Sequence, residues 1–588
     1  MIRNAGIFPA AILLALTALR VYSQDSHPVW AASEPVWPWE PVGKLWEAFA
    51  TLEKIPGAGP PWPKQYGEIC AAVEKVRAHP DGLGDFLTAP LRAECLERTA
   101  AHPISLTLNV GAYPVAREYP LGRTFEIYES GWHSNRVDPE IAKTWEDMPS
   151  AVETELRYPV TPQSFLYFRM GLRRDLAAWH RDPGGLNLPQ SLDEVDLNEP
   201  SLGYFHAETE SFTLTLGRFP VHWSPSPDFG LALSNSVPFH NGAELGLKMG
   251  RVRYRFLLSS LNPWLQGTPR GDSANEDFPP GSEEYLQRHY GSEHGASIFH
   301  KRVYAENIKT LFAHRLEGLF GPFGAGLTET QIIGGKFPDF RDAGPFVIFH
   351  NDFKDGYTNS ALSADATLRL PAGFSIAAEL YMDDLEYAGT EAGNGNTASL
   401  LGYLAALRHS FTAHGWILTQ SIHIIRTDPF LYGYLQPLNT AFSRRILASN
   451  YRPAGDSLLV DRYIVDSPIG YSRGGDAYDF WYRVDAWKGS RIRLSLAAAC
   501  LAKGQVESST PYEDYYTSPH DSPTGVVERE IRVGLEGDYH WSRALSTHAG
   551  FGWQSLRNQG HVRGDDADRF QVSTGVAWSL QSLAFRKD

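Results

Sequence analysis

Aromatic side chains are concentrated in three stretches of the sequence that are otherwise polar. These stretches are NPWLQG (Asn262 to Gly267), FLYGYLQPLN (Phe430 to Asn439) and PYEDYY (Pro511 to Tyr516). Sugars are usually held by aromatic faces together with planar hydrogen-bonding groups, so these stretches are candidates for saccharide binding. The candidate residues are Trp264, Tyr432, Tyr434, Tyr512, Tyr515 and Tyr516. The alternative is that the same rings fold the loops on which they lie.

Motifs for catalysis or for a cofactor give a weaker signal. The sequence has no H-E-x-x-H zinc motif and no glycine loop of the type that cradles phosphate. His314 and Glu317 resemble an acid–base pair, but residues three apart in a strand point to opposite faces. The oxygen-rich stretch NDFKDGYTN (Asn351 to Asn359) lacks the full spacing of a calcium loop. We therefore predict a non-catalytic protein with no cofactor and no metal site.

Charged and apolar residues alternate in the segment EIRVGLEGDYHW. In an extended strand, successive side chains point to opposite faces. The charged face would hold Glu530, Arg532, Glu536, Asp538 and His540, and the apolar face Ile531, Val533, Leu535, Tyr539 and Trp541. The same period recurs in roughly 18 segments of about 10 residues from about Ile104 onward, and this is the length that a tilted strand needs to cross a bilayer.

Short and long connections alternate between these segments. MGR, KGS and LPAG are short turns, whereas residues 262–304, 426–477 and 504–527 are long polar loops. Short turns on one rim and long loops on the other are typical of outer-membrane barrels, and closure leaves no unpaired strand edge in the bilayer. We predict an all-β transmembrane barrel of about 18 antiparallel strands, with apolar residues on lipid and charged residues in the lumen. An aromatic girdle would include Tyr539, Trp541, Trp553 and Trp578.

The first hundred residues follow different patterns. Residues 1–23 have a positive Arg3, an apolar run and a small-residue cleavage site, as in a secretory signal peptide. Residues 24–103 include apolar positions at helical spacing from Pro41 to His102, which predicts a small N-terminal α-helical bundle. Residues 104–588 would form the barrel. Cys70 and Cys95 could form a disulfide in an oxidising compartment, or all three cysteines could be unpaired.

Charge narrows the range of partners. The chain has 53 Lys and Arg against 68 Asp and Glu, a formal net charge of −15. An acidic exported chain is a poor candidate for nucleic-acid binding through a basic surface. The predicted location is the bacterial outer membrane, which the chain would reach through its signal peptide. The expected partners are outer-membrane lipid and the barrel-assembly machinery.

Three stretches in a fixed order suggest a family. They are LGRFPVHWSPSPDFGLALSNSVPF (Leu216 to Phe239), LFAHRLEGLFGPFGAGLTETQIIGG (Leu311 to Gly335) and GFSIAAELYMDDLEY (Gly373 to Tyr387), and SPIGYSRGGDAYDFWYRVDAW follows them. Together they resemble the Wzi-like capsule assembly family of bacterial outer-membrane barrels, over roughly residues 202–504. One departure is the turn after Gly217-Arg218, which is usually glycine-rich and here contains two prolines.

The resemblance implies an 18-stranded barrel with a periplasmic helical bundle that holds capsular polysaccharide at the cell surface in a lectin-like way. The residues in its motifs, expected to face the lumen, are Gly217, Arg218, Trp223, Ser234, His314, Arg315, Glu329, Asp383 and Asp384. The charged ones could bind saccharide or set a pore's selectivity, or they could cross-link and plug the lumen. A diffusion channel for sugars or other small solutes, and a surface adhesin, are the alternative functions.

Overall fold

The computed structural model describes most of the predicted barrel and part of the region that precedes it. The described residues are 35–37, 40–52, 64–77, 91–92, 95, 104–114, 132–161, 163–182, 184–196, 201–261, 309–334, 338, 344, 358–384, 400–433, 439–454, 457–506, 522–542 and 544–581. The predicted signal peptide, residues 1–23, lies outside them.

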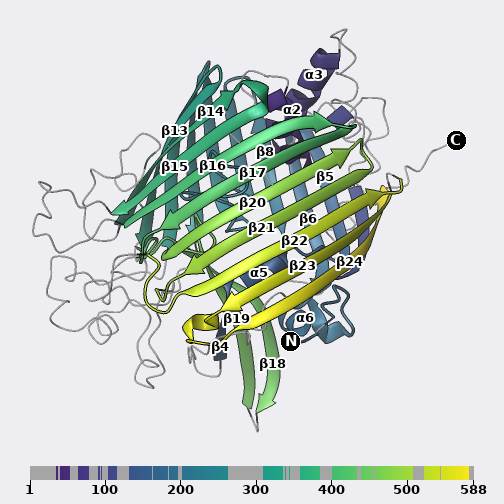
Figure 1. Cartoon of the computed structure of the whole chain (residues 1–588), viewed down its shortest axis with the longest axis vertical. Helices are drawn as coiled ribbons and strands as arrows, with labels where there is room; N and C mark the ends of the chain where they lie inside the picture. The colour runs from purple at the N-terminus through teal and green to yellow at the C-terminus, as the bar shows by residue number, and fades with distance from the viewer. Residues whose placement is uncertain are drawn as a thin grey trace, which may run out of the picture.

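Eighteen strands of the described chain form one closed antiparallel barrel (Figure 1). The first nine are β3 (Ile104–Ala112), β5 (Val152–Thr161), β6 (Ser164–Arg174), β8 (Leu202–Glu208), β9 (Phe212–Phe219), β10 (His240–Met249), β11 (Val252–Leu261), β12 (Lys309–Phe320) and β13 (Phe323–Gly334). The other nine are β14 (Thr358–Leu370), β15 (Phe374–Asp384), β16 (Leu400–Ala413), β17 (Trp416–Thr427), β20 (Ala477–Lys488), β21 (Ile492–Lys503), β22 (Glu528–His540), β23 (Leu545–Arg557) and β24 (Ala567–Gln581). A short strand, β7 (Val195–Asp196), pairs with the end of β6.

The barrel closes between its last and first strands. β24 pairs with β3 in antiparallel register from Thr574 opposite Ala112 to Gln581 opposite Ser105. Closure gives every strand of the wall a hydrogen-bonded neighbour on both sides, so the wall has no free edge. The prediction of a closed antiparallel barrel of about 18 strands is therefore confirmed.

The two rims of the barrel differ in the length of their connections. Tight turns join β10 to β11 and β20 to β21, with Gly250 and Gly489 at φ of 62° and 57°, a region that favours glycine. The connections that leave the other ends of these strands are long, such as residues 262–308 and 504–527. We call these ends the short-turn rim and the long-loop rim. The predicted asymmetry between short turns and long loops is thus present.

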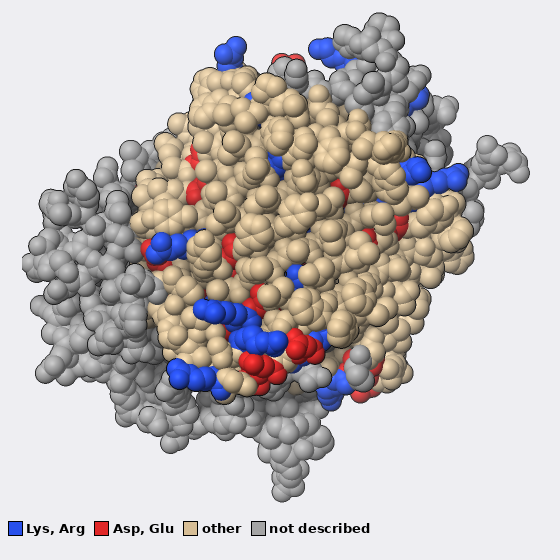
Figure 2. Space-filling view, viewed as in Figure 1, with Lys and Arg blue, Asp and Glu red and all other residues tan. Residues whose placement is uncertain are grey.

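Side chains alternate between the two faces of the wall as the sequence predicts. On β22, Ile531 and Leu535 are 46% and 49% exposed, whereas Glu530 is 1% exposed. Figure 2 shows the outer surface as a broad area of uncharged residues, with Lys, Arg, Asp and Glu gathered mainly toward its edges. Trp541 and Trp578 are also exposed, and both lie close to the short-turn rim. Apolar residues therefore cover the outside and charged residues line the inside.

Several elements in the connections are absent from the sequence prediction. The stretch 426–477, expected to be a polar loop, contains the hairpin β18 (Phe442–Ala454) and β19 (Ser457–Pro468). β19 pairs in parallel with β4 (Trp132–Val137), and this small sheet extends beyond the barrel wall (Figure 1). Helix α5 (Pro139–Asp147) begins at the capping residue Asp138, and helix α6 (Leu176–Arg181) begins at Asp175. These elements are short and lie between strands, so they leave little periodic signal in the sequence.

Two helices precede the barrel in the described part of the chain. They are α2 (Pro41–Leu52) and α3 (Tyr66–Arg77). A short strand precedes each helix, and the two strands, β1 (Pro35–Val36) and β2 (Lys64–Gln65), pair with each other. The apolar face of α2 shares one buried cluster with Ile69, Leu91 and the barrel residues Ile417 and Trp487. The N-terminal region therefore packs directly on the barrel near its short-turn rim, and its formation of a separate bundle stays a prediction.

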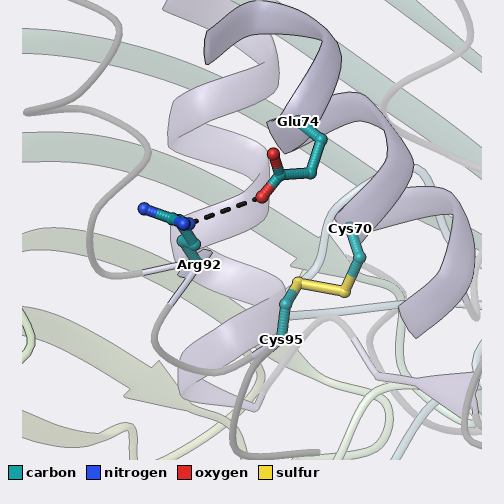
Figure 3. Close-up of a disulfide and its surroundings, with 4 residues drawn as sticks. All are labelled: Cys70, Glu74, Arg92 and Cys95. Atoms are coloured by element: carbon teal, nitrogen blue, oxygen red, sulfur yellow. Dashed lines mark ion pairs between the residues drawn. A yellow bond between two sulfur atoms is a disulfide. The ribbon is translucent and has the colours of Figure 1, made fainter. Parts of the chain in front are cut away.

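A disulfide joins Cys70 of α3 to Cys95, with a Cα–Cα distance of 5.7 Å (Figure 3). Beside it, Arg92 Nε lies 3.4 Å from Glu74 Oε1. Cys500, on β21, is free and exposed. Among the described residues, no helix has the length and apolar content required to cross a membrane.

Candidate functional site

Residues 220–239, between β9 and β10, fold into the barrel instead of forming an external loop. We call them the inner segment. Pro220, Pro225 and Pro227 lack the backbone donor that a strand ladder needs, so β9 does not continue past Phe219. Trp223 and Leu231 are buried in the largest apolar cluster of the described chain, together with residues from the opposite wall such as Leu404 and Ile425. The inner segment therefore spans the lumen from β9 toward β15, β16 and β17.

Glu379 of β15 holds the inner segment through its carboxylate. Its Oε2 accepts hydrogen bonds from Ser224 Oγ at 2.8 Å and from the backbone nitrogen of Leu231 at 3.2 Å. Its Oε1 accepts one from the backbone nitrogen of Ala232 at 2.9 Å. Ser363 Oγ of β14 also donates to Oε1, at 3.2 Å. The buried carboxylate therefore satisfies two backbone groups that the bent segment would otherwise leave unpaired.

Arg315 of β12 forms a second attachment. Its Nη1 and Nη2 donate to the two oxygens of Asp365 at 2.5 and 2.9 Å, and its Nε donates to Glu317 at 2.9 Å. Nη1 also lies 3.4 Å from the backbone oxygen of Trp223. The guanidinium of Arg255 lies over the Trp223 ring, 4.9 Å from its centroid. Arg315 therefore connects two wall strands, β12 and β14, to the inner segment.

Residues near Tyr432 and Tyr471 also contact the inner segment. These contacts lie on its side toward the long-loop rim. The Tyr432 hydroxyl donates to the backbone oxygen of Leu231 at 2.7 Å and accepts from the backbone nitrogen of Tyr471 at 2.9 Å. The backbone nitrogen of Tyr432 donates to Asp383 Oδ2 at 2.8 Å. Ser236 Oγ of the inner segment donates to the backbone oxygen of Pro468 at 2.6 Å. Two segments from distant parts of the chain thus fill the lumen together.

Charged residues join the inner segment to α2. Asp228 Oδ1 lies 3.4 Å from Lys44 Nζ, and its Oδ2 lies 3.3 Å from Arg408 and 3.5 Å from His423. Burial raises the pKa of Asp228, but the positive charges of Lys44 and its neighbours outweigh this effect and hold the pKa well below its usual range. Asp228 is therefore ionised at neutral pH. It links a helix at one end of the barrel to the segment that crosses its interior.

His222 is the other titratable group of the inner segment beside Asp228. It is fully buried, and its Nε2 lies 2.7 Å from the backbone oxygen of Ser226. Burial lowers the pKa of His222 to about 4, so the ring is neutral at physiological pH. A neutral ring that donates to a carbonyl at this distance stabilises the turn at Pro225.

Most of the predicted sugar-binding residues lie outside the described part of the chain. These are Trp264, Tyr434, Tyr512, Tyr515 and Tyr516. Tyr432 is described and corrects the expectation of an exposed loop, because its side chain is buried and its hydroxyl is used in the contacts given above. Saccharide binding by the other five residues stays a prediction.

Three residues expected in the lumen face outward instead. Side chains alternate along a strand, and Arg218, His314 and Glu329 share the faces of the exposed Leu216, Leu316 and Leu327, respectively. His314 and Glu329 lie opposite each other on β12 and β13, with Nε2 and Oε2 2.6 Å apart. Arg218 donates to Asn241 at 2.8 Å and lies over the Phe239 ring. The lumenal assignment of these three is wrong, because the alternation of side chains along each strand places them on the outer face.

The remaining motif residues lie at the inner segment or at its contacts. Trp223 and Ser234 belong to the inner segment, and Arg315 and Asp383 bind it or its neighbours. Gly217 has φ of 123°, and a Cβ there would lie 2.4 Å from the backbone oxygen of Gly203, so no larger residue fits. Asp384 ends β15, and its side chain is not among those described.

Three residues central to the site were not singled out by the sequence analysis. Lys44 and Asp228 have no local motif, and their contact depends on the fold. Glu379 did carry a signal, because it lies on the same strand face as Ser375, Tyr381 and Asp383, opposite the apolar face. A carboxylate on the inward face of a strand is a candidate for a buried hydrogen-bonding site once closure is known.

The described residues give no support for a hydrolase nucleophile turn or a metal centre. Gly470-Tyr471-Ser472-Arg473-Gly474 has the G-x-S-x-G spacing of a hydrolase nucleophile turn, a match that the sequence analysis missed. It lies between strands β19 and β20, whereas that turn requires a strand followed by a helix. Within the described residues, no group of three or more His, Cys, Asp or Glu side chains is placed to hold a metal ion.

Comparisons with known proteins show similarity in fold. Wzi, from Escherichia coli, whose structure is described as a carbohydrate-binding β-barrel of the outer membrane involved in group 1 capsule assembly, is 12% identical; the alignment covers 92% of this chain and 98% of that one, with a TM-score of 0.52. OprD from Pseudomonas aeruginosa is 11% identical over 82% of this chain and 94% of its own, with a TM-score of 0.37. OmpT of Vibrio cholerae is 9% identical over 81% and 97%, with a TM-score of 0.29.

Sequence comparison adds no assignment. No protein-family model matches the chain, and no curated protein sequence matches it. The class of fold rests on structure instead. The closed 18-stranded wall and the structural similarity to Wzi give the fold of an outer-membrane β-barrel protein.

Proposed function

We propose that this protein is a bacterial outer-membrane barrel that binds or organises surface polysaccharide through its long loops and has no catalytic activity. The observation that carries the proposal is the filled lumen. The inner segment crosses the barrel and is held from several wall strands by Glu379, Arg315 and Asp228. A barrel whose interior is occupied in this way is better suited to present its loops than to conduct solutes.

The outer surface supports the membrane location. Exposed leucine, isoleucine, valine and phenylalanine side chains cover the wall, and tryptophans lie near one rim. An apolar band of this kind is stable in a bilayer and would drive aggregation in water. The expected location is the bacterial outer membrane, after export and insertion by the barrel-assembly machinery.

The polysaccharide ligand is supported by two independent features. The sequence places aromatic clusters in connections that belong to the long-loop rim. Wzi, with the same fold, carries a structural description as a carbohydrate-binding barrel. Mixed aromatic and polar loops are the chemistry that sugar rings require.

Loop variants test the polysaccharide function. We expect the triple variant Tyr512→Ala, Tyr515→Ala and Tyr516→Ala to lose at least tenfold in affinity for purified capsular or exopolysaccharide on a glycan array. The matched triple Phe variant keeps the rings and should retain most binding. Unchanged binding by the Ala variant would exclude these tyrosines as the binding residues.

Conductance in planar bilayers tests the channel alternative. A filled barrel should give no steady single-channel steps at 1 M salt, a condition that we choose because it makes small conductances visible. Regular steps of constant size from the wild-type protein would contradict the hypothesis that the lumen is closed to solutes and would favour a solute channel.

A further inference from the structure

A cavity of about 70 Å³ lies inside the barrel, between the inner segment and the short-turn rim. Residues of β8 to β12 form its wall, and Phe219, the last residue of β9, belongs to its lining. Trp37 and Glu68, from the N-terminal region, complete it. Glu68 is exposed, so the cavity reaches the surface on the side of the helices. It lies at the rim opposite the long loops.

Most of the charged residues that line this cavity belong to ion pairs within the protein, although Glu68 and Arg253 line it as well. Arg255 Nη2 lies 2.7 Å from Glu244 Oε1, Lys248 pairs with Glu208, and Arg315 pairs with Glu317. A charged ligand that binds one member of an ion pair would compete with the other member. The displaced side chain would then be a buried charge without a partner. A neutral ligand does not meet this cost.

One buried acceptor remains available in the lining. Glu317 is 3% exposed, and its Oε2 accepts from Arg315 Nε, whereas its Oε1 has no hydrogen-bond partner among the described residues. A buried carboxylate oxygen without a donor is unfavourable by about 1–3 kcal/mol or more. The donor that it lacks is an O–H or N–H group, and this group can come from a bound molecule.

Aromatic side chains and hydroxyl groups also line the cavity. Trp37, Tyr204 and Phe219 line the cavity together with Thr213 and Thr215. Flat apolar faces next to hydroxyls and carboxylates suit a molecule with apolar C–H faces and a rim of hydroxyl groups.

We propose that this cavity binds a neutral polyhydroxylated ligand, a single sugar or a short saccharide, that enters from the short-turn rim. The site is separate from the loops of the proposed function, because it lies toward the short-turn rim and those loops leave the strands at the other rim. The ligand's hydroxyls donate to Glu317 and accept from the arginines, while its apolar face packs on Trp37. The ion pairs of the wall stay intact.

Binding by the purified full-length protein gives the first test. The protein is kept in lauryldimethylamine oxide, which has no sugar headgroup, and saturation-transfer NMR is recorded with glucose and maltose and with charged glucuronate and glucosamine. We expect transfer to the neutral sugars and at least tenfold weaker binding of the charged ones. Absence of binding by the neutral sugars, or equal binding of all four, would overturn the proposal.

Two variants locate the binding. Trp37→Ala removes an aromatic face, and Thr215→Val removes a hydroxyl with little change in volume; each should weaken maltose binding about tenfold. Trp416→Ala is the matched control, because Trp416 is the first residue of β17 and lies outside the cavity. Equal affinities in all three folded variants would contradict the location.

Chemical protection provides a test that does not depend on weakened variants. Thr215→Cys is introduced together with Cys500→Ser, so that the only reactive thiol lies in the cavity. Maltose should slow its modification by a water-soluble methanethiosulfonate at least fivefold, and an unchanged rate would refute the site. The triple Tyr512, Tyr515 and Tyr516 to Ala variant should show the same protection, so loop binding and cavity binding can fail separately.

Discussion

Lys44 Nζ of α2 lies 3.4 Å from Asp228 Oδ1 of the inner segment, although the helix precedes the first barrel strand. Both side chains are largely buried, at 11% and 12% exposure. The pair therefore connects the N-terminal region to the segment that fills the lumen. Because Arg408 and His423 also contact Asp228, the helix, the inner segment and two wall strands share one charge cluster.

Lys44→Ala should destabilise the filled barrel. Removal of one partner from a buried ion pair usually costs about 3–5 kcal/mol, and we expect the lower end here because Arg408 stays close to Asp228. The measurement is urea unfolding in detergent micelles. Lys143→Ala is the control, since its pair with Asp147 on α5 is exposed and should contribute only about 0.5 kcal/mol. Equal effects of the two substitutions would refute the role assigned to Lys44.

Acid should weaken this cluster only below the pKa of an ordinary aspartate. The Asp228 pKa is lowered in the folded protein, so its stabilising effect is fully present above its unfolded pKa of about 3.9 and is lost as pH falls through the folded value. We expect the difference in unfolding free energy between wild type and Asp228→Asn to be constant from about pH 5 to 7 and to shrink below about pH 4. A difference that grows on acidification would have the wrong sign.

Arg315→Ala should be among the most destabilising single changes in the described barrel. It leaves Asp365 and Glu317 buried without their common cation, at an expected cost of about 3–5 kcal/mol in unfolding free energy. Arg315→Lys keeps the charge but loses the two-pronged contact with Asp365, so it should recover only part of the loss. Arg557→Ala, which affects an exposed pair with Asp568, should change stability by less than about 1 kcal/mol.

A charge on the outer wall tests its contact with lipid. Leu535→Arg places a cation at an exposed apolar position on β22 and should cost about 2–4 kcal/mol if the position lies at the bilayer centre. The assay is folding into lipid vesicles, followed by the mobility shift on unheated gels. Leu192→Arg is the control, because Leu192 is 92% exposed in a connection outside the wall and should tolerate the change. Normal folding of Leu535→Arg would argue against a bilayer at this depth.

Much of the barrel could be predicted because strand alternation is a local property. On β22 each residue's face follows from its parity alone, so Ile531 and Leu535 were assigned correctly to the outside. The disulfide partners were also correctly considered, since Cys70 and Cys95 lie in one helical region. Short elements such as α6 were missed, because six residues carry too little periodicity to identify a helix.

The two-residue period by itself determined a closed wall with an apolar outside and a charged inside, because a barrel is the arrangement that pairs every edge of such strands. What occupies the inside was decided only by the tertiary structure. The contacts of Glu379 with Ala232, of Arg315 with Trp223 and of Lys44 with Asp228 join positions far apart in the chain. Their partners depend on strand register and on the path of the inner segment, and neither is encoded in any short stretch of residues.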